Sequence, residues 1–324
     1  MYSTPIYKNV HFLSTFDHKS DSKTLVIMNT LSQVYDDDIT ISHNIIPLDF
    51  ESIDGVPDSH LWSQSDESPQ RIQTNNPRDS LIPVIDLSNP CAIDLIGQAC
   101  KTWGMFQVIN HGVPLELVKK VEFEARRLFA LTTHEKRKVL RSPTGATGYG
   151  LPRISPFFAK CMWHEGFTIM GSCVDDAKVL WPHDYQRFCD TMDDYQNQMK
   201  LLAHKLLLLS LQTLDVTQEE INWATSTHGS NGLEIFVEGL GWSPVSPIEG
   251  AFVVNVGDLL HIFSNAKFPV VYHRAMVNQS KHRISVAYFY GPPIESTLAP
   301  LSNYQDPVFQ IFACERVYKI ESHT

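Results

Sequence analysis

The chain lacks the features that mark membrane-spanning and secreted proteins. None of its 324 residues lie in a run approaching the ~20 apolar residues that a transmembrane helix needs. The first residues hold no apolar segment between a basic start and a small-residue cleavage site, so no secretory signal is predicted. The six cysteines form no C-x-x-C pair and are too sparse for a disulfide framework, which favours free thiols in a reducing compartment. We therefore expect a cytoplasmic protein with no membrane contact.

Positive charge is also scarce. Lys and Arg number 26 against 36 Asp and Glu, which gives a formal net charge of −10 and an isoelectric point near 5.7. A field of this sign disfavours nucleic acid and anionic membranes as partners. Hydrophobic residues make up 43% of the chain, which is enough for a substantial core and excludes wholesale disorder.

Several common catalytic motifs are missing. The sequence has neither a G-x-S-x-G nucleophile elbow nor an H-E-x-x-H zinc motif. Residues 145–150 are rich in glycine, but their order is G-x-x-G-x-G and no strand-to-helix context surrounds them. A flexible loop is therefore favoured there over a phosphate-binding cradle.

The order of the predicted elements indicates an α+β fold. Residues 1–80 carry few signals of order and are predicted to be a loosely ordered leader and linker. Hydrophobic periodicity then predicts helices at 94–100, 117–129 and 185–214, with strands at 81–87 and 105–109 and a loop region at 142–176. Strands dominate after Trp223, at 233–237, 251–256, 270–277 and 283–290. Helices followed by strands are typical of α+β proteins.

The last of these strands carries a candidate anion site. Arg283 and Ser285 lie two residues apart and therefore point to the same face of the strand. If that face is buried, the guanidinium needs a carboxylate partner, which a diacid cosubstrate would supply, with Ser285 adding a hydroxyl donor. The alternative is an exposed strand with a solvated arginine, and spacing alone favours that alternative.

The preceding strand carries a candidate metal ligand. His273 lies ten positions before Arg283, and a hairpin between the two strands would bring both side chains into one cavity. Imidazole suits iron, zinc or copper. A lone histidine is more often structural, so spacing alone does not favour the metal.

Longer motifs carry a resemblance to a known family. The segments that resemble plant iron(II)/2-oxoglutarate-dependent dioxygenases are Trp103–Pro114, Asn255–Leu260, Tyr272–Ala275 and His282–Pro293. Within that family, the segments similar to the gibberellin 3-beta-dioxygenases are Gly148–Gly150, Arg153–Ser155 and Met162–Ile169. The resemblance covers roughly residues 82–300.

The resemblance implies a double-stranded β-helix, or jelly-roll, core with helices packed around it. It implies iron(II) held by two histidines and one carboxylate, 2-oxoglutarate and dioxygen as cosubstrates, and ascorbate as reductant. The implied substrate is a gibberellin precursor, hydroxylated at carbon 3 on the beta face to give the active hormone. Carried over by motif, His273 is the distal iron ligand, and Arg283 and Ser285 hold the far carboxylate of 2-oxoglutarate. No other residue is assigned a catalytic role.

The sequence departs from this family at the metal site. The family's other two ligands lie in a His-x-Asp motif, yet none of the 14 histidines here is followed two positions later by Asp or Glu. In the near misses, at His134, His164 and His183, the acidic residue is adjacent instead. The family's Asn-x-Tyr-Pro segment is absent too. Family-like sequence stops near Trp223 and resumes near residue 231. Between these two points the family places several strands, on the order of tens of residues.

The loss predicts an incomplete jelly roll. We expect a leader at 1–80, an N-terminal helical dioxygenase region at 81–223, a partial jelly roll at 224–300 and a divergent tail at 301–324. His228 lies in the junction, but its neighbours do not match the metal motif. One of three ligands does not make an iron site.

Three interpretations follow from the sequence. The first is gibberellin 3-beta-hydroxylation, with this chain an incomplete version of the enzyme. The second is an inactive relative that at most binds a ligand or a partner. The third keeps the enzyme class but changes the substrate, to another gibberellin oxidase or a flavonoid dioxygenase, and the Met162–Ile169 segment argues against it.

Overall fold

The computed structural model describes most of the central part of the chain and short pieces near its ends. The described residues are 14–28, 82–141, 147–150, 164–214, 233–237, 239–275, 281–292, 297–301, 308–309 and 312–313. Predictions made for His228, for Arg153–Ser155 and for nearly all of the tail therefore lie outside the described residues.

Most helices of the described chain precede residue 213. They are α1 (Ala92–Thr102), α2 (Leu115–Phe129), α3 (Thr133–Lys136), the 3-10 turn η2 (Arg137–Val139), α4 (Val174–Leu180), α5 (Tyr185–Gln212) and α6 (Asp258–Phe263). Among the helices of the described residues, none has both the length and the apolar character needed to cross a bilayer. The three helices predicted from periodicity are confirmed as α1, α2 and α5.

Local chemistry explains where some of these helices begin. Pro114 stands immediately before α2, where its fixed φ suits a helix start and its missing N–H costs nothing. Thr132 begins α3 with a capping box, in which its hydroxyl accepts from the Glu135 backbone N–H and the Glu135 carboxylate accepts from the Thr132 N–H.

The strands of the described residues form four sheets. Their orders are β10 (Lys281–Phe289), β1 (Ser14–Met28), β5 (His164–Met170) and β4 (Gly148–Gly150) in the first; β2 (Val84–Asp86), β3 (Met105–Ile109) and β8 (Phe252–Asn255) in the second; β7 (Gly241–Pro244), β6 (Leu233–Val237) and β9 (His273–Ala275) in the third; and β11 (Thr297–Leu298) with β12 (Phe312–Ala313) in the fourth. The predicted loop region at 142–176 thus contains β4, β5 and the start of α4. Its glycines and aromatics obscured the alternation of β5 in the sequence.

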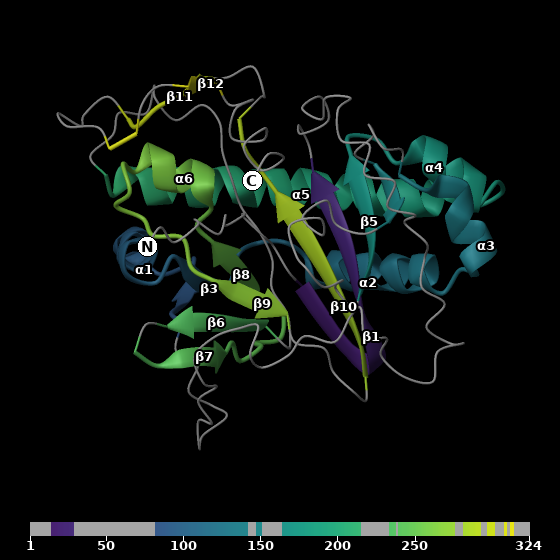
Figure 1. The fold of residues 1–324 in the computed structure, drawn as a ribbon, viewed down its shortest axis with the longest axis horizontal. Helices are drawn as coiled ribbons and strands as arrows, with labels where there is room; N and C mark the ends of the chain where they lie inside the picture. Colours follow the sequence, from purple (N-terminus) through teal and green to yellow (C-terminus); the bar gives the residue numbers. More distant parts are fainter. Residues whose placement is uncertain are drawn as a thin grey trace, which may run out of the picture.

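Strand β1 holds a central place in the first sheet. Residues 22–28 run parallel to β5, and residues 21–28 run parallel to β10. Residues 14–17 pair with β10 as well, so that Ser285 has two partners in β1, Thr15 and Thr24. Because a strand has two edges, β1 doubles back and pairs along both edges of β10, as its two purple segments show (Figure 1). These fifteen residues form a strand inside the stretch for which the sequence predicts a loose leader.

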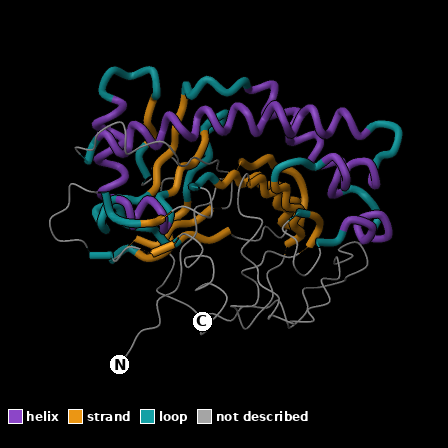
Figure 2. Tube along the Cα trace, turned by 90° about the horizontal axis from the view of Figure 1, so that it is seen from above, coloured by secondary structure: helices purple, strands orange, loops and turns teal. Residues whose placement is uncertain are grey.

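One large hydrophobic core joins the helices to the sheets. The long helix α5 runs along one side of the strands (Figure 2). Its predicted apolar stripe is buried in that core, at Phe188, Met192, Tyr195, Met199 and Leu202. The middle of α1 packs against the end of α5, where a Cβ on Gly97 would lie 2.5 Å from Cγ2 of Thr213.

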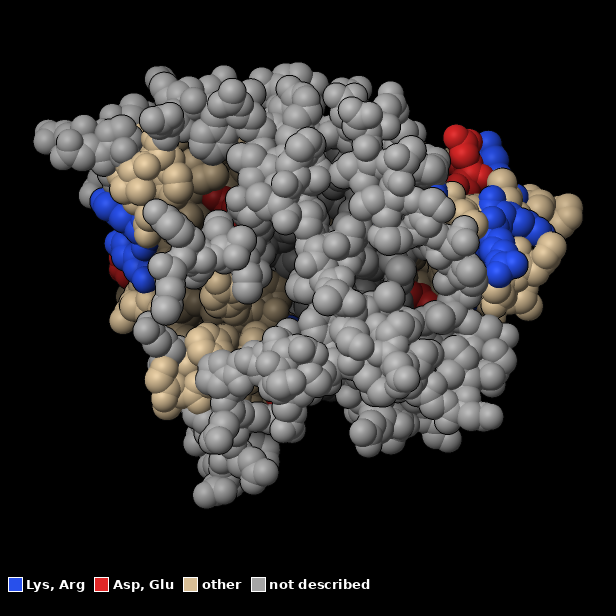
Figure 3. Space-filling view, in the orientation of Figure 1, with Lys and Arg blue, Asp and Glu red and all other residues tan. Residues whose placement is uncertain are grey.

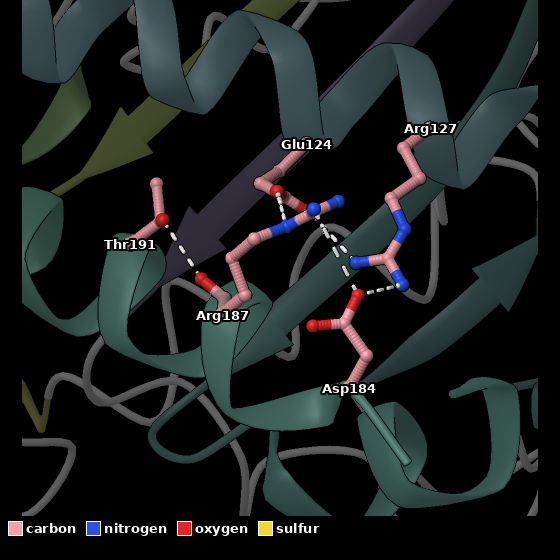
Figure 4. A network of polar contacts seen from close by, with 5 residues as sticks. All are labelled: Glu124, Arg127, Asp184, Arg187 and Thr191. Atoms are coloured by element: carbon pink, nitrogen blue, oxygen red, sulfur yellow. Dashed lines mark hydrogen bonds and ion pairs between the residues drawn. The ribbon is translucent and has the colours of Figure 1, made fainter. Parts of the chain in front are cut away.

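A charged network fastens α2 to the start of α5. Arg187 Nε and Arg127 Nη1 donate to the two oxygens of the buried Glu124 carboxylate, at 2.7 and 3.2 Å. Arg127 also pairs with Asp184 at 2.7 Å, and the Thr191 hydroxyl donates to the Arg187 carbonyl (Figure 4). The Glu124 charge is buried with two cationic partners, the condition under which a buried carboxylate is tolerated. Among the described residues, Lys and Arg are visible at both flanks of the face in Figure 3.

Candidate functional site

Strand β10 places the candidate anion-binding residues inside the protein. Arg283 is 6% exposed and Ser285 is fully buried, so the alternative of a solvated arginine on an exposed strand is wrong. Both residues lie on one face of β10, and Arg283 Nη1 donates to Ser285 Oγ at 3.3 Å. Burial lowers the pKa of the Arg283 guanidinium to about 10. A guanidinium and a hydroxyl on one buried strand face suit a carboxylate ligand.

The opposite face of β10 belongs to the core. Ile284, Val286 and Tyr288 are all buried in the main hydrophobic cluster. The alternation predicted from the sequence is therefore confirmed, with the difference that both faces are buried. Such a strand holds the arginine in a fixed position because neither face can turn toward water.

The structure separates His273 from Arg283. His273 begins β9, which pairs with β6 in the third sheet, whereas β10 lies in the first. The hairpin expected between these two strands is therefore wrong. The reason is strand pairing: β6 takes β9 as a partner, and β1 takes β10. Burial lowers the pKa of His273, and its Nδ1 lies 3.2 Å from the Val271 carbonyl oxygen.

A carboxylate near His273 is committed to another partner. Ile235 of β6 stands opposite His273, and the next residue, Glu234, stands opposite Arg274. Because neighbouring residues of a strand point to opposite faces, Glu234 and His273 lie on opposite faces of this sheet. Glu234 Oε2 accepts from Arg274 Nε at 3.0 Å, which directs that carboxylate to its ion pair.

The described residues do not fit the iron site that the sequence resemblance implies. Among them, no three His, Cys, Asp or Glu side chains come together in a way that could hold a metal ion. The near misses do not help: His134 and His183 are exposed. Their acidic neighbours serve elsewhere, since Glu135 caps α3 and Asp184 pairs with Arg127. Of the predicted ligand set, only His273 is present, and one imidazole does not make a facial triad.

A second buried polar cluster escaped the sequence analysis. Glu165 on β5 accepts a hydrogen bond from Lys136 Nζ at 2.8 Å and another from the Tyr149 hydroxyl of β4. All three side chains are buried. Burial and the neighbouring Glu165 charge raise the pKa of Tyr149, which keeps its hydroxyl a donor. The available signal was Glu165 itself, a charged residue directly before residues 166–169 in β5, which predicts a buried charge that needs a partner.

Two family profiles match the chain. The profile described as "non-haem dioxygenase in morphine synthesis N-terminal" matches residues 82–187, and that of the "2OG-Fe(II) oxygenase superfamily" matches residues 217–292. Gibberellin 3-beta-dioxygenase 1 of Pisum sativum is 41% identical, over 78% of this chain and 79% of that protein. Gibberellin 3-beta-dioxygenase 1 of Arabidopsis thaliana is 39% identical, over 83% of this chain and 87% of that protein.

Solved structures confirm the fold class. The crystal structure of JOX2 in complex with 2OG, Fe and JA is 22% identical and superposes with a TM-score of 0.64, covering 83% of this chain and 90% of that one. The rice dioxygenase for auxin oxidation is 23% identical with a TM-score of 0.57, covering 74% and 95%. At this identity the likeness concerns the fold, which is the mixed α+β architecture with the predicted jelly-roll core.

The alignments also show that positions are missing inside this chain. The pea alignment runs over 295 positions but takes in 78% of 324 residues, about 253, so about 42 positions face no residue here. The Arabidopsis alignment runs over 318 positions and takes in 83% of 324 residues, about 269, which leaves about 49. A shortfall of this size agrees with the tens of residues that the sequence predicts to be missing between Trp223 and residue 231.

Proposed function

This chain belongs to the gibberellin 3-beta-dioxygenase family of 2-oxoglutarate- and iron(II)-dependent oxygenases, and from this membership we propose that its reaction is the 3-beta-hydroxylation of a gibberellin precursor. Members of this family are oxidoreductases that use iron(II) and 2-oxoglutarate. The observation that carries the substrate assignment is the identity of 41% to the pea enzyme over most of both chains.

Within this reaction, the proposed role of Arg283 and Ser285 is to bind the far carboxylate of 2-oxoglutarate. Three features support it: the burial of both side chains, their common face on β10 and the 3.3 Å hydrogen bond that orients the guanidinium. A buried guanidinium accepts a bidentate carboxylate with little loss of conformational freedom. His273 is proposed as the distal iron ligand on motif resemblance alone.

No oxidative step can be assigned to the described residues. The oxidation needs iron(II) in a site with two histidines and a carboxylate, and the described residues supply His273 only. Binding and orientation of the diacid are the parts of the reaction for which this chain has residues in place.

The incomplete set of iron ligands also favours a second candidate function. A chain that keeps its anion-binding strand but has one iron ligand would bind 2-oxoglutarate or a gibberellin without turning either over. For both candidate functions the partners are small molecules, and the hydroxylase also uses dioxygen. We place the protein in the cytoplasm, which its free thiols at Cys91, Cys100, Cys173 and Cys189 support.

One assay separates the two candidates. The purified chain is incubated under air with iron(II), 2-oxoglutarate, ascorbate and a gibberellin precursor, and both succinate and hydroxylated product are measured. Succinate and 3-hydroxylated product in equal amounts establish the hydroxylase. Succinate no higher than in a protein-free control, together with measurable 2-oxoglutarate binding, establishes the binding protein.

A further inference from the structure

We infer that the 324-residue chain is an iron-free form of the gibberellin 3-beta-dioxygenase fold, which binds a dicarboxylate on β10 but assembles no iron site. The oxidation then belongs to a form that carries the positions missing between Trp223 and residue 231. This inference takes the reaction from the proposed function. It concerns iron binding, however, and iron content is measured independently of the reaction product.

The first support is the ligand count over the whole chain. Each of the 14 histidines lacks an Asp or Glu two positions later, so no His-x-Asp or His-x-Glu pair exists anywhere in the sequence. Two ligands two residues apart on one strand point to the same face and can bind one ion together. Without such a pair, His273 would need two ligands from separate segments.

The second support is the geometry around His273. Its cross-strand neighbour is Ile235, which offers no ligand atom, and the adjacent carboxylate, Glu234, lies on the other face of the sheet, paired with Arg274. Moving Glu234 toward His273 would break that ion pair and take the buried Glu234 carboxylate away from its cationic partner, which is costly. The local register therefore works against a second ligand from β6.

The third support is the strand that occupies the first sheet. Residues 14–28 lie outside both family matches, which cover residues 82–187 and 217–292. Nevertheless β1 pairs with β10 and β5, two strands whose residues are family-like. A segment from outside the family region thus supplies pairing partners to the edges of β10, the strand that carries Arg283. Without this segment, the missing strands would leave those edges unpaired.

Iron binding is tested directly by elemental analysis. The chain is loaded with iron(II) and 2-oxoglutarate without oxygen and desalted, with the pea relative treated in parallel. The expected result is less than a tenth of an iron per chain here and close to one per chain in the pea protein. His273→Ala is expected to leave the iron content of this chain unchanged. One tightly held iron per chain, lost in His273→Ala, would overturn the inference.

Retained dicarboxylate binding is tested without iron. Increasing concentrations of 2-oxoglutarate are expected to raise the melting temperature of the metal-free chain, and Ser285→Ala to weaken that binding. Arg283→Lys keeps the charge but loses the bidentate geometry, and we expect its affinity to fall about tenfold. A metal-free chain that shows no binding of 2-oxoglutarate would refute this half of the inference. If Arg283→Lys fails to fold, Ser285→Ala still decides the question.

A chimera tests where the oxidation belongs. The corresponding segment of the pea enzyme is inserted between Trp223 and residue 231; over the whole alignment about 42 positions of that enzyme face no residue here. We expect the chimera to bind one iron per chain, with His273→Ala abolishing the gain. A folded chimera that binds no iron would overturn the inference. A chimera that binds iron and forms succinate but no 3-hydroxylated gibberellin leaves the inference intact and refutes the proposed substrate.

Discussion

Lys136 Nζ lies 2.8 Å from Glu165 Oε1, and both side chains are almost completely buried. This ion pair joins α3 to β5, and the Tyr149 hydroxyl donates to the same carboxylate from β4. Helix α3 is thereby fixed to β5 and β4, two strands of the sheet that contains β10. A buried pair of this kind contributes little when intact but leaves a costly charge when one partner is removed.

Removing one member of this pair is expected to destabilise the protein strongly. Lys136→Met leaves the Glu165 charge without its cation, and we expect a loss of ~3–5 kcal/mol in the free energy of unfolding. Urea denaturation followed by circular dichroism measures it. Lys119→Met is the matched control, because Lys119 forms an exposed pair with Glu116 at 2.9 Å, whose loss is expected to cost less than ~1 kcal/mol. Equal losses in the two variants would contradict this account.

Gly104 is expected to tolerate no side chain. It has a φ of +63°, and an added Cβ would collide with the Pro269 carbonyl oxygen. We expect Gly104→Ala to lower the free energy of unfolding by more than ~2 kcal/mol, because strain and collision add. Gly112→Ala separates the two effects: its φ is +87° but nothing lies within 4 Å of the added Cβ, so only the strain, ~1–2 kcal/mol, is expected. Thermal unfolding of both variants checks the difference.

Stability is expected to fall in mild acid through His111. Its ring stacks on Phe252 at 3.7 Å, its Nε2 contacts the Gly250 carbonyl oxygen at 2.7 Å, and burial lowers its pKa below the ordinary 6.5. The unfolded chain therefore binds this proton at a higher pH than the folded chain does, and stability decreases as the pH falls below about 6.5. Melting temperatures between pH 8 and pH 5 should fall less steeply for His111→Gln. His134→Gln, at an exposed position, controls for the loss of a histidine.

The described thiols are expected to differ sharply in reactivity. Cys173 and Cys189 are buried with their sulfur atoms 3.7 Å apart, and burial raises the pKa of both thiols. Burial likewise raises the pKa of Cys100 to about 12, whereas Cys91 is exposed. Since the thiolate is the reactive form, alkylation at pH 8 should modify Cys91 before Cys100, Cys173 and Cys189. Peptide mapping by mass spectrometry measures this order, and rapid modification of Cys173 in the folded chain would contradict it.

The sequence predicts elements whose signal is local. Strand β3 was expected at residues 105–109 and is found there, and the stripe of α5 is buried as its period predicts. Arg283 and Ser285 share a face because alternation fixes it. The pairing partners of β9 and β10 were not predictable from the spacing of His273 and Arg283, since pairing depends on which distant strands compete for each edge. The partners of Glu165 were hidden for the same reason.

The pairing of β1 with β10 also constrains how the chain reaches its native state. Leu25 pairs with Val286, so the two strands are separated by about 260 residues of sequence. During synthesis β1 leaves the ribosome long before β10 exists, and the apolar run at its end, Leu25–Met28, has no partner until β5 is made. Closure of such a distant pair is slow, because the loop entropy must be overcome first. We therefore expect the pairing of β1 with β10 to form late, after β5 and the helices have been synthesised.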